Sequence, residues 1–383
     1  MTNHLQHLKN RVPSIDILRG IVILLMLVDH VRERVFLHHQ VADPMNLDET
    51  STALFFTRFL AHFCAPIFVF LTGLSAWLYA NPINQAPRDV RSFLFKRGAF
   101  LILLEITLVN FSWFGSYHAL YLQVIWAIGL CMISLAVLTA LPHKVIGLLG
   151  VIIVAGHNAL DFIEFTPDEF GYSIWTVLHD RGYLYMSESF KVKVSYPTLP
   201  WVGVICLGYA LGPLFAETKQ AAERVSILFK LTVICFALLI LLRGLNVYGE
   251  PVPWVYSSDW LLSLQSFINF TKYPPSLDFI LLTLGMAFCV LAMLEKYDVH
   301  ALTWLRYFGS APMFFYLLHL YVLLVMYIIL VAVFGTNKGV YFGVDDVWQV
   351  WLISIVLGAL LYKPTQLFSN FKKTTQWAWV KYF

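Results

Sequence analysis

Charged residues are scarce in this sequence. Asp, Glu, Lys and Arg make up only 13% of its 383 residues, 59% are hydrophobic, and the mean hydropathy is +0.71. Soluble domains usually carry roughly a quarter charged residues, so the composition excludes an ordinary soluble protein and predicts an integral membrane protein. The formal net charge is only +3 and no block of like charge is present. These two features also exclude a nucleic-acid-binding protein and a charged interaction tail.

Cysteine is also rare, and its placement excludes two kinds of site. The five cysteines stand singly inside apolar segments, without CxxC or Cys/His spacing, at positions 64, 131, 206, 235 and 289. Neither a metal site nor a disulfide framework is therefore predicted. Walker and Rossmann glycine motifs are missing as well, which argues against nucleotide hydrolysis and hydride transfer.

Long apolar stretches account for most of the chain. A helix needs about 20 apolar residues to cross a bilayer, and such stretches lie near 15–37, 55–80, 93–112, 119–141, 143–163, 198–216, 225–245, 276–295, 303–334 and 347–368. We predict an all-α fold, a polytopic transmembrane helix bundle of about ten spans that forms one domain over residues 1–383. The first stretch runs into Asp-His-Val-Arg-Glu-Arg rather than a cleavage site, so we expect it to be retained.

The distribution of Lys and Arg predicts the orientation of the bundle. If the N-terminus is cytoplasmic, most basic residues between spans fall on the cytoplasmic side, including the cluster in "PRDVRSFLFKRG". This positive-inside bias predicts that both termini are cytoplasmic. The longer connections near 38–54, 164–197 and 246–275 then face outward.

Polar side chains inside the predicted spans carry most of the functional information, because an ionisable group costs at least a few kcal/mol in the hydrocarbon region. These residues are Arg19, Asp29, His30, His62, Glu105, Asn110, Gln123, His157, Asn158, Asp161 and His319. Arg19 and His30 lie eleven residues apart, which places them within about 20° of the same helix face and roughly 16 Å apart along the axis. One stripe of the first helix is thus expected to reach both sides of a central cavity.

Asp29 and His30 are the main candidates for chemistry. A neutral imidazole can remove a proton from a hydroxyl or amine that attacks a thioester, and a nearby carboxylate favours the resulting imidazolium. Consecutive helix residues point about 100° apart, so the partner of His30 is Asp29, Glu105 or a group on another helix. Two other interpretations stay open: an interfacial His30 capped by Arg34, and a proton relay.

Three further residues are candidates for the same site. Glu105 is the only carboxylate well inside an apolar run. We expect it to pair with His30 or His62, or to hold Arg19. His62 precedes Pro66, whose missing N–H is expected to kink the helix, and either a structural hydrogen bond or a substrate contact suits it. His319, in "YLLHLY", is either a core histidine bonded to a tyrosine or part of the site.

Several segments resemble a known family. They are "RVPSIDILRGIVILLMLVDHVRE", "ALFFTRFLAHFCAPIFVFLTGLSAWLY", "LLEITLVNFSW", "LQVIWAIG" and "FGSAPMFFYLLHLY". They resemble the bacterial proteins of the heparan-α-glucosaminide N-acetyltransferase catalytic-domain family. More distantly, Arg19 followed by His30, and "YLLH" ending at His319, are similar to motifs of the membrane acyltransferase-3 family. The resemblance implies that an acyl group, with acetyl as the expected one, moves from cytosolic acyl-CoA to a sugar or other hydroxyl or amine acceptor across a bacterial cytoplasmic membrane.

The resemblance also implies a donor site, with acetyl-CoA or another acyl-CoA as substrate and no bound cofactor. Acyl-CoA carries several phosphates, which arginine suits, and the candidates are Arg88, Arg91 and Arg97 in the basic loop and Arg19 near the inner end of the first span. The positive-inside rule alone would place the same cluster in a short cytoplasmic loop. A proton-coupled transporter and a non-catalytic membrane scaffold are the alternatives to an acyltransferase, and the oligomeric state stays open.

Overall fold

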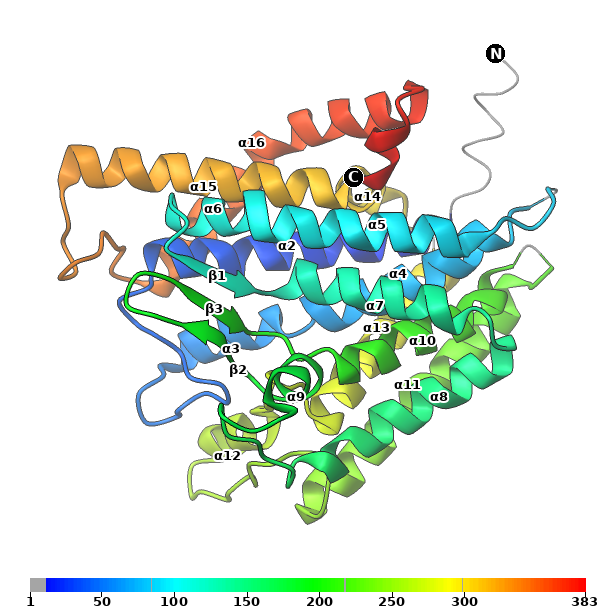
Figure 1. Ribbon diagram of the computed structural model, residues 1–383, viewed down its shortest axis with the longest axis horizontal. Helices are drawn as coiled ribbons and strands as arrows, with labels where there is room; N and C mark the ends of the chain where they lie inside the picture. Colours follow the sequence, from blue (N-terminus) through cyan, green and yellow to red (C-terminus); the bar gives the residue numbers. More distant parts are fainter. Residues whose placement is uncertain (1–11, 84, 217, 298) are drawn as a thin grey trace.

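The computed structural model describes residues 12–383 except 84, 217 and 298, and most of these residues are helical (Figure 1). The helices are α2 (Pro13–Val35), α3 (Thr52–Ala61), α4 (Cys64–Ala80), α5 (Val90–Leu104), α6 (Asn110–Phe114), α7 (Val124–Leu138), α8 (His143–Gly156), α9 (Tyr172–Leu178), α10 (Leu199–Leu211), α11 (Ala221–Leu245), α12 (Trp260–Ile268), α13 (Leu277–Lys296), α14 (Leu305–Ser310), α15 (Pro312–Phe334) and α16 (Val347–Thr374). A π-helix, η1 (Glu105–Val109), joins α5 to α6, and short 3-10 helices are η2 (His157–Leu160), η3 (Gly212–Phe215), η4 (His300–Leu302) and η5 (Ala378–Tyr382).

Six of the described helical segments are long and apolar enough to cross a membrane. They are Thr52–Ala80, His143–Leu160, Ala221–Leu245, Leu277–Lys296, Pro312–Phe334 and Val347–Thr374. Two shorter apolar helices are Val124–Leu138 and Leu199–Phe215. α2 and the continuous helix formed by α5, η1 and α6 are also long but carry several charged residues. The predicted multi-pass helical membrane protein is thereby confirmed, whereas the count of ten spans stays a prediction.

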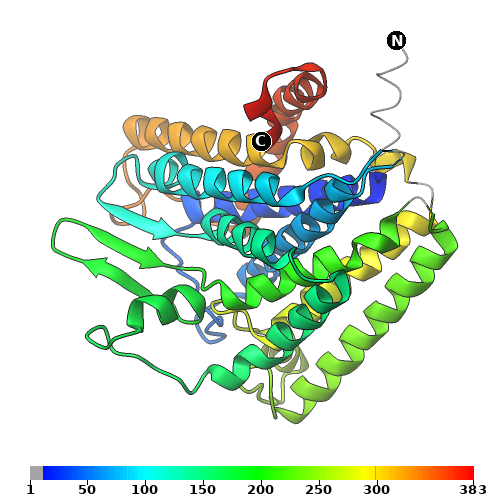
Figure 2. The same cartoon turned by 45° about the vertical axis from the view of Figure 1, so that its right-hand side comes forward.

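The connections between helices gather at two ends of the bundle. The strands, α9, α12 and the α2–α3 connection lie at one end, toward the left of Figure 1, and the α4–α5 connection with its basic residues lies at the other. Figure 2 shows the same separation. We call these the sheet end and the basic-loop end. They correspond to the loops predicted to face outward and inward, but the membrane side of each terminus stays a prediction, and residues 1–11 lie outside the described residues.

The all-α prediction holds for the bundle, to which one small three-stranded sheet is added. β1 (Ala119–Leu122) pairs in parallel with β3 (Lys191–Val194), which pairs antiparallel with β2 (Gly182–Met186). Residues 119–122 were expected to begin a membrane span. In β3, lysine and valine alternate, as expected of a strand with one buried face. The sheet covers the sheet end of the bundle and leaves α7 shorter than the predicted span.

Glycines bring α14 directly against α2, the helix that carries the main candidate residues. A Cβ atom on Gly309 would lie 1.8 Å from the carbonyl oxygen of Asp16, and one on Gly20 would lie 2.3 Å from that of Leu305. Only glycine allows the two backbones to approach so closely. The chain then breaks at Ala311 and resumes as α15, which runs beside α2 (Figure 1). This packing places the late histidine of α15 next to α2.

Candidate functional site

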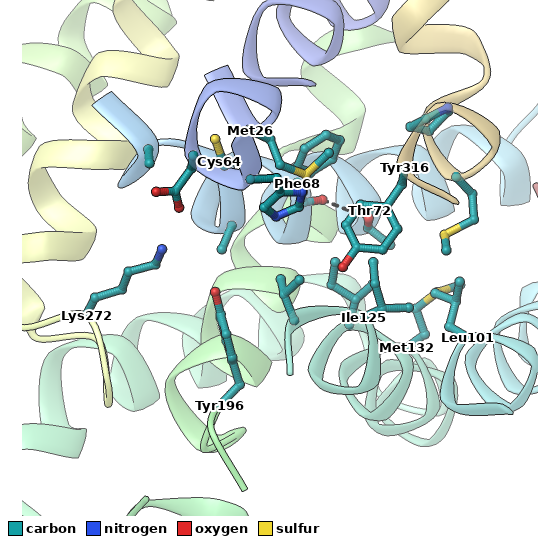
Figure 3. Close-up of a pocket in the computed structure, with 18 of the residues that line it drawn as sticks. Met26, Cys64, Phe68, Thr72, Leu101, Ile125, Met132, Tyr196, Lys272 and Tyr316 are labelled. Carbon is teal, nitrogen blue, oxygen red and sulfur yellow. Dashed lines mark hydrogen bonds between the residues drawn. The ribbon is translucent and has the colours of Figure 1, made fainter. Parts of the chain in front are cut away.

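A cavity of about 110 Å³ lies among α2, α3, α4, α5, α7 and α15, with two residues from the connections at the sheet end. Its lining is Met26, Asp29, His30, Ala61, Cys64, Ala65, Phe68, Thr72, Arg97, Leu101, Val124, Ile125, Ile128, Met132, Tyr196, Lys272, Pro312, Met313 and Tyr316. Figure 3 shows Lys272 and Tyr196 at one end of the cavity and Leu101 and Met132 at the other. Met26 and Tyr316 lie between them. The wall is mainly apolar, as in most small-molecule sites.

Two histidines meet beside this cavity. Nδ1 of His30, on α2, lies 2.7 Å from Nε2 of His319, on α15, and the two rings stack with centroids 5.0 Å apart. Both side chains are buried. His319 is therefore part of the site, and its expected tyrosine bond is replaced by a histidine bond, with the ring of Tyr316 lying edge-on at 5.7 Å.

The hydrogen-bond network assigns the proton positions in this pair when both rings are neutral. Nδ1 of His319 lies 2.7 Å from the carbonyl oxygen of Phe315, which can only accept, so this nitrogen carries the proton and donates it. Nε2 of His319 is then the acceptor for Nδ1–H of His30. A neutral imidazole has one N–H. Nε2 of His30 therefore holds a lone pair, and it forms no hydrogen bond within the described part of the chain.

Asp29 does not orient His30, although the two residues are adjacent. Its carboxylate accepts from Nε of Arg32 at 3.0 Å and from Arg58 of α3 at 2.7 Å. Arg58 was not among the predicted site residues, although its place within the apolar segment "ALFFTRFLA" marks it as unusual. Arg34, the other suggested partner of His30, instead donates to the carbonyl oxygens of residues 112 and 113. A histidine on another helix takes the orienting position.

Glu105 has a different partner from the ones expected. Its Oε2 accepts hydrogen bonds from the backbone N–H groups of Ile125 and Trp126, both at 3.0 Å. A carboxylate in this position stabilises the first turn of α7, whose N–H groups have no partner within the helix. The expected pairing with a span histidine or with Arg19 is wrong. Glu105 instead fixes the backbone of Ile125, which lines the cavity.

His62 lies at a break between α3 and α4. Pro66 has no N–H to donate to the carbonyl oxygen of His62, so the helix is interrupted at residues 62 and 63. This break agrees with the predicted kink. The buried ring of His62 packs edge-on against Phe279, with centroids 5.4 Å apart. Ala61 and Cys64 line the cavity, but His62 itself does not. The structure therefore supports a packing role at the helix break.

The four predicted cofactor-binding arginines lie in three different places. Arg97 lines the cavity. Arg88 and Arg91 are exposed at the basic-loop end, where the guanidinium of Arg88 lies 5.4 Å from the ring of Tyr79. Arg19 donates to the carbonyl oxygen of Leu71 at 3.1 Å and ties α2 to α4. Of the four, Arg97 alone shares the cavity with His30.

Two tyrosines and a lysine in the cavity wall were not among the predicted site residues. Tyr316 was mentioned only as a neighbour of His319, and Tyr196 and Lys272 lie in connections rather than in apolar runs. Because an ionisable residue in a connection is ordinary, nothing in the sequence marked Lys272. Its burial, with 3% of its surface exposed, became evident only in the folded chain.

Fold and site define a multi-pass membrane protein with a mainly apolar cavity among its helices, lined in part by His30, Asp29 and Arg97. The family model for the heparan-alpha-glucosaminide N-acetyltransferase catalytic domain matches residues 11–248, more than half of the chain. The chain therefore belongs to this family and is an acetyltransferase-like integral membrane protein. The matched part includes His30, Arg97 and Glu105, whereas His319 and Lys272 lie beyond it. Among curated proteins, none matches the sequence.

Proposed function

We propose that this protein transfers an acyl group, in the simplest case acetyl, from cytoplasmic acyl-CoA to a hydroxyl or amine acceptor that enters from the opposite face of the membrane. The observation that carries the proposal is the orientation of His30, whose Nε2 lone pair is left unbonded beside a cavity that Arg97 also lines. Family membership supports acetyl transfer. The acyl-CoA donor, the acceptor and the direction are inferred here.

The proposed chemistry needs one base. Nε2 of His30 takes the proton of the acceptor as its oxygen or nitrogen forms a bond to the thioester carbonyl carbon. The tetrahedral intermediate then expels the sulfur of CoA, which receives the proton from His30. During the intermediate His30 is an imidazolium, and Nδ1–H continues to donate to Nε2 of His319. His319 is thus a positioning residue that holds His30 in the tautomer required of a base.

The donor is expected to approach from the basic-loop end. Arg97 would bind phosphate oxygens of acyl-CoA through charge-assisted hydrogen bonds, while the exposed Arg88 and Arg91 would attract the nucleotide. In a bacterial cell this arrangement corresponds to an enzyme of the cytoplasmic membrane, with donor and acceptor on opposite sides.

The rival transporter function is less well supported by the histidine pair. A proton path through His30 and His319 would have to continue from Nδ1 of His319, but that nitrogen donates to the backbone carbonyl of Phe315. A helix carbonyl has no proton to pass on, so the path ends there. The arrangement suits a base with a fixed tautomer better than a relay.

The test is turnover by the purified protein in lipid nanodiscs. Acetyl-CoA labelled in the acetyl group is supplied with a panel of amino sugars, neutral sugars and sugar acids, and transfer of label to an acceptor supports the proposal. Uptake of a solute into proteoliposomes driven by a pH gradient, with no transfer of label, would replace it with the transporter.

A further inference from the structure

The sheet end of the cavity contains a buried lysine that the proposed reaction does not use. Lys272 lies between α12 and α13, is 3% exposed and lines the cavity. Figure 3 shows its side chain extending toward the cavity. Its Nζ lies 5.1 Å from the ring centroid of Tyr273, and within the described residues it forms no salt bridge. Lysine is almost never buried to this extent without an anionic partner.

The carboxylate in the cavity wall already has cationic partners. Asp29 is the only acidic side chain among the lining residues described here. It is bridged by both Arg32 and Arg58, and Arg32 also pairs with Glu33. The one carboxylate in the cavity wall thus already has two arginine partners, and within the described residues Lys272 forms no salt bridge with it.

The backbone that carries Lys272 is held firmly from three other segments. The N–H of Lys272 donates to the carboxylate of Asp43 at 3.2 Å, and Thr271 and Ser276 both donate to Glu250. His157 reaches the same connection through a 2.8 Å contact between its Nε2 and the carbonyl oxygen of Pro275. Such support is typical of a side chain kept in position for a ligand.

We propose that Lys272 binds a carboxylate on the acceptor, so that the acceptor is a small hydroxy or amino acid such as a sugar acid. This proposal rests on the proposed function, because it concerns the acceptor of that reaction. One ammonium group matches a single negative charge, whereas a phosphate dianion in an apolar site would need further donors. The carboxylate would sit at the sheet end and direct the acceptor's hydroxyl or amine toward His30.

Two pairs of acceptors that differ mainly in a carboxylate provide the test. They are methyl β-D-glucuronide with methyl β-D-glucoside, and muramic acid with glucosamine. Each is measured with the wild-type protein, Lys272→Met, Lys272→Arg and Lys338→Met. The last is a matched control, because Lys338 follows α15 and pairs with the exposed Asp345 rather than lining the cavity.

The expected result is that the wild type prefers at least one acid to its neutral partner. Lys272→Met should raise the KM of that acid by roughly 10- to 100-fold, the range of one buried charge-assisted hydrogen bond. The KM of the neutral partner should change less than about twofold. Lys272→Arg should retain most of the preference, and Lys338→Met should retain all of it.

Direct binding separates failure of this proposal from failure of the acyltransferase proposal. Isothermal titration with the same four compounds needs no turnover, so a preference for acids that is lost in Lys272→Met supports the carboxylate site even if no label is transferred. Equal binding of acids and neutral partners, or no binding of either acid, would overturn it. A fall in kcat for both members of a pair at unchanged KM would also overturn it, since Lys272 would then act on the reacting carbonyl. If Lys272→Met does not fold, the wild-type preference and Lys272→Arg still decide.

Discussion

Nδ1 of His30 and Nε2 of His319 lie 2.7 Å apart although 289 residues separate them in the sequence. The contact depends on the close approach of α14 to α2, which sets α15 alongside the first helix. The two rings thus form one unit, in which His319 fixes the tautomer and His30 faces the cavity. The first two predictions separate these roles.

His30→Ala should lower turnover by roughly 10²- to 10⁴-fold, the usual contribution of a general base. Acyl-CoA binding should be nearly unchanged, because the donor phosphates are expected at Arg97 rather than at the histidine pair. Turnover, donor binding and thermal melting are measured on the same preparation. Near-normal turnover by well-folded His30→Ala would remove this residue from the mechanism.

His319→Leu should lower kcat while leaving the donor KM unchanged. It deprives the buried Nδ1–H of His30 of its acceptor, which costs about 1–3 kcal/mol and corresponds to roughly a 5- to 150-fold loss. His319→Gln offers a side-chain oxygen to the same N–H and should restore part of the activity. Equal losses in the two variants, with lowered melting temperatures in both, would indicate a purely structural His319.

Arg97→Gln should raise the KM for acyl-CoA by roughly 10- to 150-fold, because a desolvated charge-assisted phosphate contact contributes about 1.5–3 kcal/mol. Arg91→Gln is the matched control. Arg91 is exposed, so solvent screens its contribution and the change should be less than about threefold. Adding Arg91→Gln to Arg97→Gln should therefore change little more. If donor affinity is unaffected in both folded variants, the two arginines do not bind the donor and serve only to set the orientation of the protein in the membrane.

The residues recognised from the sequence were those whose polarity conflicts with their surroundings. Asp29, His30, Glu105 and His319 stand out because an ionisable group in an apolar run is costly. Apart from contacts within one turn of the same helix, such as that of Asp29 with Arg32, the partners of their side chains come from other helices and could not be read from local pattern. Glu105 shows this most clearly, since it stabilises the first turn of α7 instead of binding a side chain.

The sequence predicted the class of the fold but not its smaller elements. Hydrophobic length predicted a helical membrane protein, but the strands at the sheet end have only four or five residues, and the alternation of lysine and valine in β3 is too brief to mark a strand by itself. Lys272 was missed for a related reason. A lysine in a connection is normally solvated, and the burial of this one is evident only in the folded chain, where Asp43 and Glu250 accept hydrogen bonds from the connection that carries it.

The connection that carries Lys272 also depends on a histidine outside the predicted spans. His179 follows α9, and its Nδ1 lies 2.9 Å from Asp180 while its Nε2 lies 3.2 Å from Asp161 and 3.1 Å from the carbonyl oxygen of His157. All three partners are acceptors, so both ring nitrogens carry protons. Burial opposes the charged form, but these hydrogen bonds outweigh it and raise the pKa of His179 to about 9.

This raised pKa predicts that stability falls in mildly alkaline solution. A group whose pKa is higher in the folded state stabilises the protein fully below its unfolded value, near 6.5, and the contribution is lost as the pH rises toward about 9. The melting temperature should therefore fall between these pH values, and His179→Gln should melt lower near pH 6 with a smaller dependence on pH. Identical pH profiles for wild type and His179→Gln would contradict the charged assignment.

Because the carbonyl of His157 accepts from His179 while the ring of His157 reaches Pro275, the affinity for an acidic acceptor should weaken over the same pH range in the wild type alone.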